Sequence, residues 1–234
     1  MTHPHPLDPN PMTVTTSQGD VVIDITTFGT PPWLELVKRV GIRISGGADS
    51  AILAYMLAVY KRDYKPDMSI HPITCINDRK PYQEIFAKQV LAKITDLTGV
   101  EFDEHFIENV NGDQYREDQG IFQESLYKTK KINIHFMGET LNPPIGVEAD
   151  WRFLGNGRDP TRNEKGATHV PVVIYKPFRN IDKKAIAELY QHYGVLDTLF
   201  PLTRSCEIHT FDFSNHCGHC WFCLERNWGF GRYV

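Results

Sequence analysis

The sequence lacks the features of a membrane-spanning or secreted protein. No apolar stretch approaches 18 residues, and the N-terminus has no basic region followed by an apolar one. An excess of positive charge is also missing, because the formal net charge is −4 and the isoelectric point lies near 6.2. Such a charge argues against a protein that coats nucleic acid. We therefore expect a cytoplasmic protein with no membrane contact and no bulk binding of nucleic acid.

Cysteine is scarce and unevenly placed, which argues against a framework of disulfides. The chain has five cysteines, and four of them lie close to the C-terminus. Their spacing is Cys-x10-Cys-x2-Cys-x2-Cys, and thiolates in such a tight knuckle can converge on one tetrahedral ion. Four sulfurs leave no open coordination position, so the pattern predicts a closed structural zinc site made by Cys206, Cys217, Cys220 and Cys223.

Two alternatives stay open at these cysteines. A four-cysteine set can hold an iron–sulfur cluster instead of zinc. Nearby histidines are substitute ligands if one cysteine is not used, namely His209, His216 and His219. The fifth cysteine, Cys75, stands alone at the end of a predicted strand, where it is more typical of a small core residue than of a nucleophile.

The composition predicts one α/β domain with additions at both ends. The chain has 234 residues, of which 41% are hydrophobic and 23% charged, enough to bury a full core. Residues 1–12 contain four prolines and little to bury, so they predict a disordered head. We divide the chain into an extension (1–39), a nucleotide-binding α/β domain (40–200) and a small cysteine-rich subdomain (201–234).

Strands and helices alternate through the middle of the chain, which favours a Rossmann-like parallel sheet with helices on both faces. The expected strands are 40–44, 70–76, 102–110, 132–137 and 170–175, and the expected helices are 51–61, 82–98, 118–131 and 182–193. The extension reads as a hairpin over 13–28 and a short helix over 31–39. Residues 143–170 have weak periodicity, and a substrate-side lid and a plain surface excursion are equally consistent with them.

A glycine turn between the first of these strands and its helix is the candidate phosphate site. It reads Ser45-Gly46-Gly47-Ala48-Asp49-Ser50. Adjacent glycines allow a sharp turn that brings backbone N–H groups close to a ligand, and the helix that follows adds its positive N-terminal end. No lysine follows the glycines, so this is not a Walker loop. An ordinary strand-to-helix turn is the alternative interpretation.

The loop resembles the pyrophosphate-binding loop of the PP-loop, or N-type, ATP pyrophosphatases. Together with Arg204-Ser205-Cys206 and the segment Cys217-Gly218-His219-Cys220-Trp221-Phe222-Cys223-Leu224-Glu225-Arg226, it resembles the 7-cyano-7-deazaguanine (preQ0) synthase family, called QueC or ExsB. The similarity runs from about residue 40 to about 228, including the strand and helix of 172–184. It implies an adenine nucleotide alpha-hydrolase-like fold and the cofactors ATP, Mg2+ and Zn2+.

The sequence departs from this family in three places. The family carries a Gly-Tyr-Pro-Asp-Cys-Arg segment in its substrate pocket after the fourth strand, whereas this chain has Gly138-Glu139-Thr140-Leu141-Asn142-Pro143-Pro144. The loop between the first two motif cysteines is longer, and residues 1–39 have no counterpart. The resemblance therefore supports binding of ATP and zinc by this protein more strongly than it supports a deazaguanine substrate.

The resemblance implies an adenylation reaction. The loop of residues 45–50 would hold the β- and γ-phosphates of ATP while a 7-deazaguanine-like carboxylate attacks the α-phosphorus. Ammonia would then displace AMP, and a second round would dehydrate the amide to a nitrile. Ser45, Asp49 and Ser50 would be the catalytic residues, with Asp49 orienting the loop or holding Mg2+. Contacts to nucleotide or substrate are assigned to Arg79, Glu139 and Asn142, although Arg79 and Glu139 also fit solvated surface charges.

Two other functions remain open. A PP-loop enzyme with an iron–sulfur cluster could transfer sulfur to a tRNA base, and a non-catalytic module could use the loop and the cysteine knuckle to bind a nucleotide or nucleic acid. Metal analysis distinguishes the sulfur-transfer enzyme from the zinc-containing ligase. An assay for AMP release distinguishes the non-catalytic binding module from an enzyme. Chain length does not decide between a monomer and a homodimer.

Overall fold

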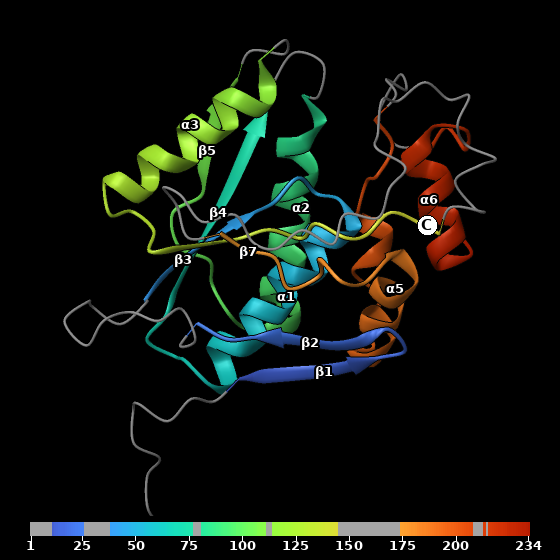
Figure 1. The fold of residues 1–234 in the computed structure, drawn as a ribbon, viewed down its shortest axis with the longest axis horizontal. Helices are drawn as coiled ribbons and strands as arrows, with labels where there is room; N and C mark the ends of the chain where they lie inside the picture. The colour runs from blue at the N-terminus through green and yellow to red at the C-terminus, as the bar shows by residue number, and fades with distance from the viewer. Residues whose placement is uncertain are drawn as a thin grey trace, which may run out of the picture.

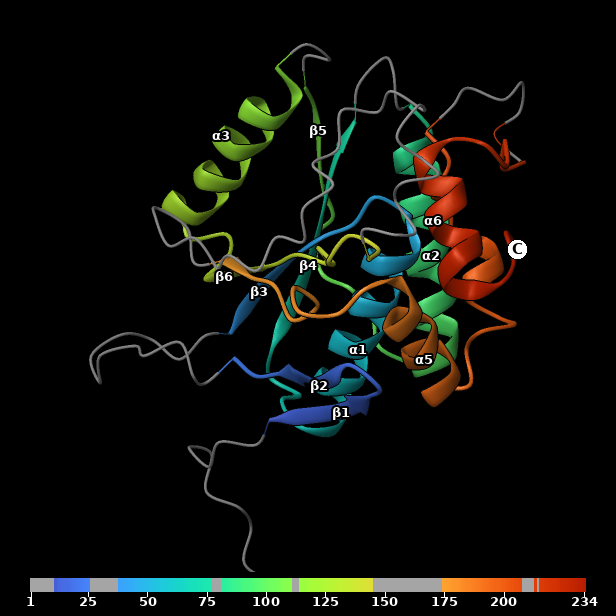
Figure 2. The same cartoon turned by 45° about the vertical axis from the view of Figure 1, so that its right-hand side comes forward.

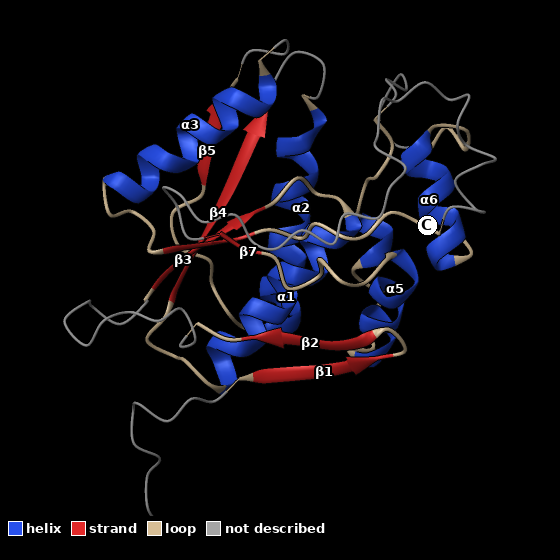
Figure 3. Cartoon of the chain, viewed as in Figure 1, coloured by secondary structure: helices blue, strands red, loops and turns tan. Residues whose placement is uncertain are grey.

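A five-stranded parallel sheet forms the centre of the molecule (Figures 1 and 3). The computed structural model describes residues 11–25, 38–76, 81–110, 114–144, 174–207, 213 and 215–234. The strand order is β5-β4-β3-β6-β7, so the chain starts in the middle and adds strands on both sides. The strands are β3 (Arg39–Arg43), β4 (Ser69–Ile76), β5 (Phe106–Asn109), β6 (Ile134–Phe136) and β7 (Ile174–Tyr175).

Helices cover both faces of this sheet, as the sequence predicts. In Figures 1 and 2, α3 lies on one side of β4 and β5, and α1 and α2 lie on the other. The apolar residues follow this division, because Val40 and Ile42 join the large core with α1, whereas Ile73 packs with Leu126 of α3. The helices are α1 (Ala48–Asp63), α2 (Tyr82–Thr98), α3 (Tyr115–Lys128), α5 (Lys183–His192) and α6 (Trp221–Phe230).

The N-terminal hairpin belongs to the main core. It consists of β1 (Met12–Thr16) and β2 (Gly19–Ile23), paired antiparallel. Val21 and Ile23 are fully buried in the same apolar cluster as α1 and α5. At the turn, the Ser17 backbone N–H donates to the Glu188 carboxylate of α5 at 2.7 Å. The hairpin therefore covers the helices as part of the domain core, although the sequence reads it as an addition.

Several predicted boundaries are confirmed and others are wrong. Helix α2 has its predicted bounds and ends at Gly99, which adopts the left-handed conformation. Strand β5 is shorter than predicted, since its pairing with β4 begins at Phe106; before it, Asp103 contacts Ile70 through both its backbone N–H, at 2.9 Å, and its carboxylate, at 2.7 Å. Arg39 begins β3, so the predicted helix over 31–39 is wrong at its last residue. Helix α6, which follows Cys220, is not among the predicted elements.

Some predictions fall outside the described residues. These are the disordered head up to residue 10, the helix over 31–37, Arg79, His209, and residues 145–170 of the irregular segment. Among the helices that are described, none combines the length and the apolar character needed to cross a membrane.

Replacing Ile23 tests whether the hairpin is part of the core. Ile23→Ala removes a fully buried side chain, and we expect it to lower the free energy of unfolding by about 2–5 kcal/mol. Thr13→Ala, at an exposed position of the paired strand, is the control and should cost less than about 1 kcal/mol. Denaturant unfolding followed by circular dichroism measures both changes. A main transition unchanged by Ile23→Ala would show that the hairpin is a separate appendage.

Candidate functional site

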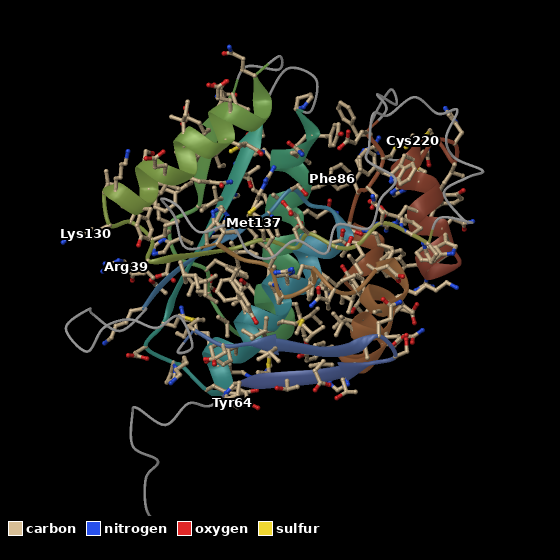
Figure 4. All side chains as sticks on the ribbon, viewed as in Figure 1. Arg39, Tyr64, Phe86, Lys130, Met137 and Cys220 are labelled. Atoms are coloured by element: carbon tan, nitrogen blue, oxygen red, sulfur yellow. The ribbon has the colours of Figure 1, made fainter. Side chains whose placement is uncertain are left out.

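The turn between β3 and α1 requires glycine. Gly46 has a φ of +76°, and a Cβ atom there would lie 2.3 Å from the Cβ of Phe86. Figure 4 labels Phe86, which belongs to α2. Gly47 is the N-cap of α1 in an extended conformation. The predicted arrangement of strand, glycine turn and helix is therefore present, and α2 packs directly against its tightest point.

Polar groups gather at the start of α1. The Ser50 hydroxyl donates to the Gly47 carbonyl at 3.1 Å and lies 3.5 Å from the Ser45 hydroxyl, which in turn accepts the Gly47 N–H at 3.4 Å. The first N–H groups of a helix have no partner within the helix, and the helix dipole makes this end positive. Two hydroxyls and the amides of a 16-residue helix can therefore bind an anion here.

Two distant segments hold the loop from opposite sides. After β6, the backbone of Gly138 passes so close that a Cβ atom there would lie 3.1 Å from the Asp49 carbonyl oxygen. On the other side, the Arg204 N–H donates to the Gly46 carbonyl at 2.8 Å. The C-terminal segment thus makes a direct backbone contact with the loop.

Asp49 points to a buried ion network. Its carboxylate accepts a hydrogen bond from the ammonium group of Lys183 in α5. The same ammonium lies 3.7 Å from the Glu225 carboxylate in α6. Lys183 and Glu225 are only 6% and 2% exposed, so their charges have little contact with water. One lysine therefore links the loop to the helix that carries a motif cysteine.

Arg204 anchors the C-terminal segment on α2. Its guanidinium lies 5.1 Å from the ring centre of Tyr82, 5.8 Å from that of Phe86 and 5.7 Å from that of Phe213. It donates hydrogen bonds to the Phe213 carbonyl and, at 3.0 Å, to the Asn215 carbonyl. Cation–π contacts of a buried arginine are stabilising. The residue that closes the loop is thus fixed by aromatic packing.

The four motif cysteines meet at one point. Their sulfur atoms all lie within 4.8 Å of one another, and the sulfurs of Cys217 and Cys223 are 3.8 Å apart. Zinc–sulfur bonds of about 2.3 Å in a tetrahedron place the sulfurs roughly 3.8 Å apart, so the spacing fits a single ion. A cluster of several irons would hold its thiolates farther apart. The group consists of Cys206, Cys217, Cys220 and Cys223.

The pKa shifts within this group oppose each other, because the hydrogen bond with Cys220 raises the pKa of the Cys223 thiol. Hydrogen bonding from Cys223 lowers the pKa of the Cys220 thiol to about 5, because the neighbouring thiol stabilises its thiolate. Burial raises the pKa of the Cys75 thiol to about 11. A metal ligand must be a thiolate, so Cys220 suits that role. Cys75 fits a core residue, as its sequence position indicates.

The described histidines make other contacts. His216 accepts the Ser205 N–H at 3.3 Å through its Nε2 atom, and burial together with two nearby arginines lowers its pKa to about 4. The Nδ1 atom of His219 lies 2.8 Å from the Cys217 carbonyl oxygen. Neither histidine joins the group of four sulfurs.

Arg226 ties α6 to the segment that carries Cys206. Its guanidinium donates to the Thr203 hydroxyl at 2.8 Å and to the Ser205 hydroxyl at 3.1 Å, and it lies 3.7 Å from the ring centre of Phe200. Arg226 is fully buried, which lowers its pKa to about 10. Arg226 therefore joins the segment of Cys206 to the helix of Cys223 through protein contacts that do not depend on a metal.

Of the residues predicted to contact nucleotide or substrate, only some lie in segments that reach the loop of residues 45–50. Glu139 follows Gly138, which touches the start of α1, but its carboxylate pairs with the Lys176 ammonium at 2.5 Å. Asn142 is buried, 8% exposed, and lies in the segment after β6. Arg79 is outside the described residues. This ion pair agrees with the alternative interpretation of Glu139 as a surface charge.

The ion network and the arginine anchors were not identified from the sequence. Lys183 lies in the strand-and-helix segment that carries part of the resemblance, but the sequence assigned it no role. Glu225 and Arg204 lie beside motif cysteines, where charged residues usually face solvent. Only the fold shows that these side chains converge on the loop.

Comparison with known families bears on these features. The family model described as "Queuosine biosynthesis protein QueC" matches residues 161–234, which contain Lys183, Arg204 and all four clustered cysteines. The C-terminal third of the chain is thus similar to this family, in agreement with the resemblance that the cysteine motif indicates. The match covers about a third of the chain, and the loop of residues 45–50 lies before it.

Two solved enzyme structures are similar to this chain at low sequence identity. One is the U34-tRNA thiolase NcsA from Methanococcus maripaludis with its [4Fe-4S] cluster, 17% identical with a TM-score of 0.46, covering 85% of this chain and 72% of that one. The other is an NAD+ synthetase from Burkholderia pseudomallei, 13% identical with a TM-score of 0.41, covering 81% of this chain and 74% of that one. No curated protein matches the sequence.

Removing the charge of Lys183 tests the ion network. Lys183→Met leaves two carboxylates without the cation between them, and we expect the free energy of unfolding to fall by about 3–5 kcal/mol. Lys184→Met is the matched control, because Lys184 is exposed and its ammonium lies over the Trp228 ring. Its cost should stay below about 1 kcal/mol. Equal costs in denaturant unfolding would contradict the network.

Replacing one clustered cysteine tests the metal site. Cys220→Ser should reduce bound metal and the melting temperature together, because structural metal binding is coupled to folding. Cys75→Ser, outside the group, should leave the metal content unchanged. Elemental analysis of each purified protein and thermal unfolding measure both properties. Full metal occupancy in Cys220→Ser would place the site elsewhere.

Proposed function

We propose that this protein is an ATP-dependent ligase that adenylates a carboxylate and joins it to ammonia. The observation that carries the proposal is the anion-binding loop of residues 45–50, closed by Arg204 from the QueC-like part of the chain. The acceptor is 7-carboxy-7-deazaguanine or a related acid, and the products are an amide or nitrile, AMP and pyrophosphate.

The loop residues have separate roles in this proposal. The first N–H groups of α1 and the hydroxyls of Ser45 and Ser50 bind the β- and γ-phosphates, where negative charge collects as pyrophosphate leaves. Asp49 helps to hold Mg2+, which shields the phosphates. The Lys183 ammonium, beside Asp49, adds a positive charge at the same place.

The chemistry consists of two transfers. A carboxylate oxygen attacks the α-phosphorus, the new oxygen–phosphorus bond forms, and the bond to the β-phosphate breaks as pyrophosphate takes the electron pair. Ammonia then attacks the acyl carbon and AMP leaves. A second adenylation, on the amide oxygen, makes loss of that oxygen as AMP possible and gives the nitrile.

The metal in the cysteine group is proposed to be zinc in a structural role. When bound, it cross-links the segment of Cys206 to the start of α6. The close spacing of the sulfurs favours one ion over an iron–sulfur cluster, and therefore disfavours the sulfur-transfer alternative. Iron and a brown colour in the purified protein would reverse this assignment.

Neutralising Asp49 tests the proposed chemistry. Asp49→Asn keeps a side chain of the same size but removes the charge that would hold Mg2+, so AMP formation should fall at least 100-fold. Asp63→Asn, at the exposed far end of the same helix, is the matched control and should keep full activity. The assay measures AMP release with ATP, Mg2+, ammonium and 7-carboxy-7-deazaguanine.

Two results would count against the proposal. Full activity in Asp49→Asn would remove the loop from the chemistry. Failure of the folded, metal-loaded protein to form AMP with any carboxylate would favour the alternative in which the loop and cysteine knuckle form a binding module.

A further inference from the structure

A second polar cluster lies on the face of the sheet that α3 covers. Side chains of a strand alternate between faces, so Gly41 and Arg43 share one face of β3, opposite Val40 and Ile42. His135 pairs with Gly41 in the neighbouring strand and shares this face. An apolar cluster that includes Ile73, Leu126 and Ile132 covers part of this face, and Ile73 pairs with Arg43 in the sheet. Beside this cluster, the face carries the polar side chains of Arg43 and His135 and, from α3, that of Gln119.

Arg43 has a charge without a counterion. Its guanidinium donates to the Gln119 side-chain oxygen of α3, and no carboxylate of the described chain forms an ion pair with it. A guanidinium has five N–H donors in a planar fork, most of which remain available here. Its charge is felt at His135, where burial and Arg43 together lower the pKa to about 3. Arg43 therefore places a positive charge beside neutral polar groups on this face.

Other buried polar atoms in this cluster also lack partners. His135 is fully buried, and neither of its ring nitrogens has a hydrogen-bond partner among the residues that the structure describes. Gln123 is 6% exposed and lies one helical turn after Gln119. Its buried side-chain nitrogen also has no hydrogen-bond partner among the described residues. Buried polar groups in folded proteins are normally satisfied, so several unsatisfied atoms on one face indicate that a ligand completes them.

The cluster is close to the loop that would bind ATP. Arg43 is the last residue of β3, and Ser45 follows it by two positions. Ligands of open α/β sheets bind at the carboxyl ends of the strands, and Arg43 lies at that edge, whereas His135 is level with Gly41, two residues before it. A group held by Arg43 would thus lie next to a nucleotide held by the loop.

We propose that Arg43, Gln119, Gln123 and His135 form the acceptor site, in which Arg43 binds the carboxylate of the acid that is adenylated. The inference rests on the proposed function, and it assigns the acceptor site to residues outside the loop. Arginine binds a carboxylate through two parallel hydrogen bonds and so fixes its direction. The two glutamine amides and the imidazole offer donors and acceptors to the polar edge of a heterocycle.

Direct binding measurements test this site. The probes are 7-carboxy-7-deazaguanine, its neutral carboxamide, and α,β-methylene-ATP, which cannot release pyrophosphate. Arg43→Gln should weaken binding of the acid roughly 10- to 100-fold, since a hydrogen-bonded charge is lost. Affinities for the carboxamide and the nucleotide should change less than about 3-fold. Arg39→Gln, at the opposite end of β3 (Figure 4), is the matched control and should leave all three affinities unchanged.

A second variant covers the case in which Arg43→Gln does not fold. Gln123→Leu replaces a buried amide by an apolar group of similar size. If Gln123 only fills the core, this variant will bind all probes normally; if it contacts the acceptor, binding of both acid and carboxamide will weaken at least 5-fold while nucleotide binding is retained. Thermal unfolding of each variant establishes that it is folded.

The outcomes separate this inference from the proposed function. A native protein that binds the acid but forms no AMP would refute the function while the variants still test the site. Unchanged affinity for the acid in Arg43→Gln, or an equal loss for acid, carboxamide and nucleotide, would overturn the site. A native protein that binds neither acid nor carboxamide would overturn it as well.

Discussion

Lys183 places one positive charge between two carboxylates that come from opposite ends of the chain. Asp49 lies in the first turn of α1, and Glu225 lies in α6, two residues after Cys223. A buried carboxylate is costly unless it is paired, so each group depends on the others being in place. The candidate phosphate loop and the cysteine group are therefore parts of one structure that share a buried ion.

Aromatic and backbone contacts reinforce this connection. Phe86 closes against Gly46, and Arg204 packs on Phe86 while its own N–H group holds the Gly46 carbonyl. Arg226 then fixes the adjoining segment to α6. The residues that shape the loop thus come from α2 and from the C-terminal segment.

The sequence predicted the features that depend on neighbouring residues. The alternation of apolar runs, the glycine end of α2 and the spacing of the cysteines are local signals, and the sheet, the bounds of α2 and the four-sulfur group followed from them. Pairings across the fold had no such signal. Strand β5 begins at Phe106, later than predicted, and the role of Lys183 depends on partners far away in the sequence.

The backbone contact between Arg204 and Gly46 also orders events in time. A ribosome makes the strand, the glycine turn and α1 early, but the segment that closes the turn emerges near the end of synthesis. Until then, the loop has all of its own residues and lacks the partners that define its shape. A nascent or C-terminally truncated chain would consequently contain the full glycine turn without the backbone contact that fixes its shape.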